Sequence, residues 1–230
     1  MLSVPEWQAV RLSLLVATVA VVCSLPFAIG IGWLMAKRRF RGKLILETLI
    51  NLPLVLPPVV TGYLLLVLFG RQGVLGSWLE LTLGLRFVFD WKGAALASAV
   101  VAFPLLVRPI RLAFSSIDDR LVQAARTLGA GPFDAFRTIL LPLARPGILS
   151  GCLLGFARSV GEFGATIMIA GSIPGQTRTI PLLIYSQLDA PGGIQASVRL
   201  VLASVVIAAL ALLVGELIDR RSQARLRGAI

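Results

Sequence analysis

The stretch QAARTLGAGPFDAFRTILLP, residues 123–142, interrupts a chain that is otherwise dominated by long apolar runs. It combines alanine and glycine with two arginines, one aspartate and two prolines. Glycine and proline mark turns, so this composition is typical of a connection between regular elements rather than of one of the apolar runs. Its role depends on where those runs place it.

The composition is that of an integral membrane protein. Of the 230 residues, 57% are apolar and 14% are charged, and the mean hydropathy is +0.89, far from the balance of a soluble domain. The net charge of +11 would suggest nucleic acid as a partner of a soluble protein, but here the basic residues lie between apolar runs. We therefore interpret the charge as a sign of membrane topology, with the lipid bilayer and not nucleic acid as the partner.

The composition also argues against catalysis. The chain has no histidine, which removes the commonest general base and transition-metal ligand, and its two cysteines lie inside apolar runs. We predict that the protein is not an enzyme and that it has neither a cofactor nor a metal site. A membrane enzyme is the alternative, but Glu162 would be its sole acid deep in the membrane.

Five apolar runs predict an all-α membrane protein with a single transmembrane domain over residues 1–230. The expected spans are residues 12–36, 48–70, 93–114, 146–173 and 197–218. Prolines should bend or break the second span near its start. The third run is short and crosses only if Arg108 and Arg111 extend to the interface. Basic residues follow the first run instead of preceding it, so we expect no cleaved signal peptide.

The basic residues predict the orientation of these spans. Residues 37–43, 108–145 and 220–227 hold 15 of the 22 basic residues, and the connections on the other side hold 6. Lysine and arginine are retained on the cytoplasmic side. The N-terminus is therefore predicted outside, the C-terminus in the cytoplasm, and residues 116–142 on the cytoplasmic face of a multi-pass protein.

This cytoplasmic segment is predicted to form two short helices around a sharp turn. Ser116, followed by Asp119, resembles a helix start. The first helix has an apolar face at helical spacing, made of Leu121, Ala124, Ala125 and Leu128. Gly129 is suited to closing it, and Pro132 to opening a second helix with Phe133 and Phe136 on one side. An interfacial loop with arginines on lipid phosphates fits the periodicity equally well.

The spacing of the segment resembles the EAA-G-I-LP signature of permease subunits in bacterial ABC importers. Gln123 stands where that signature has glutamate, so a negative charge is missing. The resemblance implies a type I importer permease fold in which this coupling helix docks on a separate ATPase subunit. The docking residues would be Gln123, Ala124, Ala125, Leu128, Gly129, Phe133, Phe136, Ile139 and Pro142.

Three further stretches are similar to molybdate permeases of that family: NLPLVLPPVVTGYLLL (51–66), ARSVGEFGATI (157–167) and IPGQTRTIP (173–181). The resemblance implies an ATP-driven importer of molybdate, or tungstate, in the bacterial inner membrane. Its partners would be two ATPase copies, an extracytoplasmic molybdate-binding protein and a second copy of this chain. Sulfate and thiosulfate permeases are similar in several of the same places. The Gly42-Lys43 pair lacks the context of a phosphate-binding loop, so ATP must be hydrolysed by a partner.

Two groups of residues are candidates for the translocation path or its gate. Arg158 and Glu162 are four residues apart in the fourth span, where unpaired charges are costly, so a mutual ion pair is the structural alternative. Pro57, Pro58 and Thr61, together with Gly62, form a kinked polar notch in the second span, and a purely structural kink is the alternative there. A channel or carrier that works without ATP remains a further alternative for the whole chain.

Overall fold

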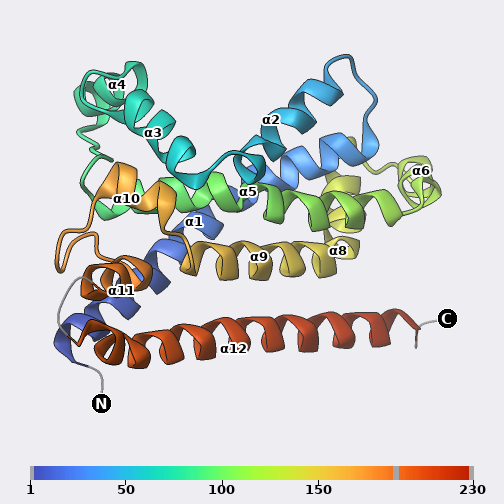
Figure 1. Cartoon of the computed structure of the whole chain (residues 1–230). Coiled ribbons are helices and arrows are strands. Elements are labelled where there is room, and N and C mark those ends of the chain that lie inside the picture. The colour runs from blue at the N-terminus through green and yellow to red at the C-terminus, as the bar shows by residue number, and fades with distance from the viewer. Residues whose placement is uncertain (1–2, 189–191, 228–230) are drawn as a thin grey trace.

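The computed structural model describes residues 3–188 and 192–227, and all regular structure in this part of the chain is helical (Figure 1). In chain order the helices are α1 (Val4–Lys37), α2 (Lys43–Val55), α3 (Pro58–Phe69), α4 (Val74–Leu83), α5 (Trp91–Ser116), α6 (Asp119–Thr127), α7 (Pro132–Ala135), the π-helix η1 (Phe136–Leu140), α8 (Leu141–Leu143), α9 (Arg145–Val160), α10 (Gly164–Ala170), α11 (Ile180–Leu188) and α12 (Gly193–Arg227).

Within the part of the chain that the structure describes, three helices are each long and apolar enough to cross a membrane: α1, α5 and α12. They coincide with the predicted spans 12–36, 93–114 and 197–218 and extend beyond them. The start of α1 and the end of α12 lie at opposite ends of the molecule, with α6 at the same end as the end of α12 (Figure 1). The helix α5 lies at the centre and packs against both α1 and α9. In its apolar 18-residue stretch, 61% of the residues are buried.

The second predicted span is a broken helix. The axes of α2 and α3 differ by 114° across a break at Leu56 and Pro57, although together they lead from one end of the molecule to the other (Figure 1). The prolines do break this run, but the break lies well inside it and not near its start. A residue that precedes proline avoids the helical region, and both Leu56 and Pro57 are extended, whereas Pro53 is accommodated inside α2.

The fourth predicted span, residues 146–173, is not one helix, and this expectation was wrong. The helix α9 ends at Val160, and after a three-residue break α10 runs separately from Gly164 and packs against α3 and α5. The break is stabilised because the carboxylate of Glu162 accepts a hydrogen bond from the N–H of Ala165, which caps the new helix (2.9 Å). At its other end α9 is preceded by residues 132–143, at a bend of 65°.

The arginines of α5, whose extension to the membrane surface the third span was expected to require, are bound by a neighbouring helix. Arg108 binds the side chain of Asn51, and Arg111 binds that of Glu47, so both are held by α2. The span is secured by these contacts and by burial of its apolar face, in which Leu106, Ile110 and Phe114 are almost fully buried.

Close packing of α9 on α5 depends on glycines at every fourth position of α9. At Gly147 and Gly151 an added Cβ would lie 2.6 Å and 2.7 Å, respectively, from backbone carbonyl oxygens of α5. At Gly155 it would overlap the side chain of Leu106. Small residues at this spacing let two helix backbones approach each other in a membrane. The pair α5 and α9 is therefore the tightly packed centre of the bundle.

Candidate functional site

The first candidate site is the unit formed by α6 and α7, which projects at one end of the bundle (Figure 1). The helix α6 is capped by Asp118, whose side chain accepts a hydrogen bond from the N–H of Arg120 (2.9 Å), so the start predicted at Ser116 was wrong. Gly129 has a φ of +92°, the left-handed conformation expected at the end of a helix. The N–H of Ala130 then donates to the carbonyl of Ala125 (3.0 Å), which closes the turn.

The unit is anchored to the bundle by a lysine at the end of α1. The Nζ of Lys37 donates to the carbonyl oxygen of Ile117 (2.6 Å) and to Oδ1 of Asp119 (2.5 Å). With 13% of its side chain exposed, Lys37 is largely covered. Sequence reasoning treated Lys37 only as one of several basic residues that indicate topology, because nothing local pairs it with residues 80 positions away.

A second anchor is aromatic. The ring of Phe136 lies 5.7 Å from that of Trp33 and 6.1 Å from that of Phe114, measured between ring centroids. Phe136 was predicted to share an exposed side with Phe133 and to enter a partner's pocket, and this is wrong. Phe133 is 75% exposed, whereas Phe136, the first residue of the π-helix at residues 136–140, is partly buried and packs against the core.

The remaining predicted docking residues divide into an exposed and a packed group. Gln123 and Ala124 are exposed, Ala125 is partly buried, and the apolar side chains of Leu121 and Leu128 are 48% and 89% exposed. Ile139 and Pro142 are half-buried in the helical connection towards α9. We define the docking face as Leu121, Ala124, Leu128 and Phe133. An exposed apolar surface of this kind is typical of a contact with another protein or with the membrane.

The second candidate site is the junction where both broken spans meet. The start of α10 packs on the start of α3: a Cβ at Gly164 would lie 2.8 Å from the Cβ of Pro58. One turn further, a Cβ at Gly62 would lie 2.6 Å from the carbonyl oxygen of Ala165. The predicted notch and the predicted charged pair therefore belong to one region. Pro57 and Pro58 are exposed, and Thr61 is buried.

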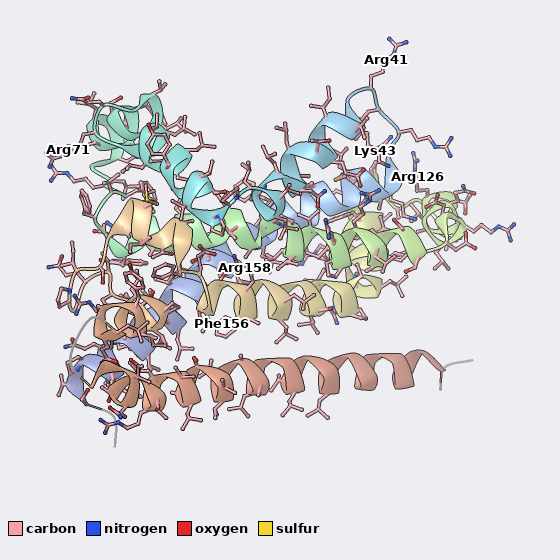
Figure 2. The ribbon with its side chains drawn as sticks, viewed as in Figure 1. Arg41, Lys43, Arg71, Arg126, Phe156 and Arg158 are labelled. Atoms are coloured by element: carbon pink, nitrogen blue, oxygen red, sulfur yellow. The ribbon has the colours of Figure 1, made fainter. Side chains whose placement is uncertain are left out.

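At this junction Arg158 and Glu162 form an ion pair, with 2.8 Å between Nη1 and Oε2. Glu162 lies beyond the end of α9, and its side chain is 2% exposed, whereas that of Arg158 is 31% exposed. Figure 2 places Arg158 between the two ends of the molecule, at the end of α9 that faces the break. Because Glu162 also caps α10, the pair holds both sides of the break together.

The sequence has clear relatives. A family model described as "Binding-protein-dependent transport system inner membrane component" matches residues 28–227. The molybdenum transport system permease protein ModB of Escherichia coli is 53% identical over 221 residues, 96% of either protein. The protein of that name from Haemophilus influenzae is 52% identical over 221 residues, again 96% of either. The sulfate transport system permease protein CysW of Escherichia coli is 35% identical over 205 residues, 86% of this chain and 69% of CysW.

Solved structures share the fold. The MetNI methionine ABC transporter in its inward-facing conformation aligns over 94% of both chains with a TM-score of 0.67 and 17% identity. A bacterial alginate ABC transporter, in complex with an alginate pentasaccharide-bound periplasmic protein, aligns over 96% of this chain and 80% of its own with a TM-score of 0.69 and 18% identity. The predicted type I importer permease fold is confirmed.

Proposed function

The chain belongs to the family of binding-protein-dependent transport system inner membrane components, and on this premise we propose that it is the permease subunit of an ATP-driven importer of molybdate. It acts as one transmembrane domain that carries no ATPase of its own. A soluble ABC ATPase supplies the energy, and an extracytoplasmic binding protein delivers the anion, as a periplasmic protein accompanies the alginate transporter.

The observation that carries this proposal is the docking face. Leu121, Leu128 and Phe133 are exposed on a unit that is nevertheless fixed to the bundle by Lys37 and Phe136. An apolar face that is firmly anchored to the bundle can transmit a partner's movement, because displacement of the unit must also displace the helices to which it is attached. We assign this face to the contact with the ATPase subunit.

The orientation follows from the same assignment. Arg41, Lys43 and Arg126 lie at the end of the molecule that carries α6, and Arg71 lies at the opposite end (Figure 2). The excess of basic residues near α6 supports a cytoplasmic location of the docking face. The N-terminus then lies outside, and the C-terminal end of α12 lies in the cytoplasm.

The path is assigned to the junction of the two broken spans. Pro57 and Pro58 have no N–H, so the carbonyl oxygens of Pro53 and Leu54 receive no helical hydrogen bond. Irregular backbone within a membrane must be covered by protein or line a water-filled cavity. This requirement is met if two copies of the chain face each other across α2 and α3, because the broken segments then line a path that the two copies enclose. Two copies would also carry two docking faces, one for each of two ATPase subunits.

The substrate is assigned from the relatives, and sulfate is the competing candidate because CysW is also similar. The test is the anion spectrum that stimulates ATP hydrolysis by the complete complex with its binding protein in proteoliposomes. Stimulation by molybdate and tungstate at concentrations where sulfate and thiosulfate have no effect supports the assignment. Stimulation by sulfate alone makes the protein a sulfate permease, and anion uptake without the ATPase makes it a channel or carrier.

Coupling is tested by two glycines that are matched in backbone geometry. Gly42 and Gly129 both have a φ of +92°, and an added Cβ at either would meet nothing within 4 Å. Alanine at each position therefore costs about 1–2 kcal/mol of local strain without a clash. Gly129→Ala should uncouple ATP hydrolysis from uptake, whereas Gly42→Ala, in the loop between α1 and α2, should leave the ratio of anion to ATP unchanged. Equal effects of the two variants would contradict the docking assignment.

A further inference from the structure

A cleft of about 500 Å³ lies between α2 and α5, and none of the residues singled out for the path or the docking face lines it. Its polar lining consists of Glu47, Asn51, Arg108, Arg111 and Ser115. A buried water takes up about 30 Å³, so the cleft has room for a small tetrahedral anion together with several waters.

The charges of the lining side chains do not cancel. The Nη1 of Arg111 lies 2.6 Å from Oε1 of Glu47, so these two charges neutralise each other. Arg108 binds a neutral amide instead: its Nε and Nη2 donate to Oδ1 of Asn51 at 3.0 Å and 2.6 Å. No carboxylate among the described residues pairs with Arg108. The cleft therefore keeps one positive charge, at Arg108.

The guanidinium of Arg108 is held in a fixed orientation that leaves one edge available. The Nδ2 of Asn51 donates to the carbonyl oxygen of Glu47 (2.7 Å), which turns the amide oxygen of Asn51 towards Arg108. Two of the five N–H groups of Arg108 are used on Asn51. The described residues offer no acceptor to the other three. Two parallel N–H groups in this geometry match two oxygens of an oxyanion.

The cleft lies between the proposed path and the docking face. Arg108 is 17 residues after the start of α5, or about 26 Å along the helix axis at 1.5 Å per residue. On α2, Asn51 precedes the break at Pro57 by six residues, or about 9 Å. An anion that leaves the junction towards the end that carries α6 would pass this position.

We propose that Arg108, oriented by Asn51, forms a weak binding site for a tetrahedral oxyanion on the cytoplasmic half of the path, which the transported dianion occupies before release. This inference rests on the proposed function. The same chemistry would bind the phosphate of a lipid headgroup, so the test must separate the two sources of the ligand.

The experiment is calorimetric titration of sodium molybdate, and separately of dihexanoyl phosphatidylglycerol, into the purified complex of this chain with its ATPase in lipid-free detergent. The binding protein is left out, because its own site would dominate. The wild type should bind molybdate weakly, and Arg108→Gln should weaken binding at least tenfold. Arg41→Gln is the matched control: it removes one positive charge at the same end of the molecule, in a loop outside the cleft (Figure 2).

A second variant guards against misfolding of Arg108→Gln. Asn51→Asp changes few atoms and supplies Arg108 with an internal carboxylate, so it should keep the fold and its thermal stability while binding of molybdate is lost. Molybdate binding that is unchanged in Arg108→Gln or Asn51→Asp, or Arg108-dependent binding of the lipid but not of molybdate, overturns the inference. Failure of the proposed function would give a different result from these binding outcomes, because the complete wild-type transporter would then take up no molybdate at all.

Discussion

The packing of α9 on α5 makes a quantitative prediction for alanine at Gly151. An added Cβ would lie 2.7 Å from the carbonyl oxygen of Leu106, and ordinary contact begins at 3.4 Å, so the two helices must separate by about 0.7 Å. Overpacking of this kind costs about 1–3 kcal/mol. Alanine is also about 1 kcal/mol better than glycine inside a helix. The net effect of Gly151→Ala is therefore between neutral and a loss of about 2 kcal/mol.

The matched control is Gly30→Ala in α1, because a Cβ at Gly30 meets nothing within 4 Å and only the gain in helix propensity applies. The difference between the two variants isolates the steric cost of about 1–3 kcal/mol. In a domain of this length each kcal/mol shifts Tm by about 2–4 °C. Thermal unfolding in detergent, followed by circular dichroism, measures this difference. If Gly151→Ala were as stable as Gly30→Ala, α5 and α9 would not be packed as closely as described.

Further substitutions test the other contacts. Phe136→Ala should lower stability by about 2–4 kcal/mol because it leaves a cavity, whereas Phe133→Ala should leave Tm unchanged and weaken co-purification with the ATPase; the reverse pattern would contradict the docking face. Lys37→Met should make residues 117–131 more sensitive to trypsin and lower uptake at unchanged expression; unaltered cleavage would show that the lysine is no anchor. Glu162→Gln should lower the free energy of unfolding by about 1–3 kcal/mol, and the double variant with Arg158→Gln should recover part of this loss. An unchanged Tm in Glu162→Gln would show that the pair does not stabilise the fold.

Three of the predicted spans coincide with helices that are long and apolar enough to cross a membrane, because length and apolar composition are local properties. Turn chemistry likewise predicted the left-handed conformation of Gly129, since only glycine adopts it at little cost. The misses concern contacts between distant segments. Nothing near Phe136 in the sequence indicates that its ring meets Trp33, and nothing near Arg108 indicates a partner on α2, because such contacts depend on how the helices pack.

The two helix breaks at the junction also show that local sequence does not reveal contacts that depend on packing. The sequence around both breaks is largely apolar, because Leu56 and Phe163 are as apolar as the residues of an uninterrupted helix. At the first break the two adjacent prolines, Pro57 and Pro58, predict the interruption. At the second, the decisive residue is Glu162, which looks like half of a helical ion pair but also caps the helix after the break. A charge that is costly inside the membrane is retained here because it accepts a hydrogen bond from the N–H of Ala165, which the break leaves without a helical partner, and pairs with Arg158. The position where the helix is interrupted is thus also the position to which we assign the path.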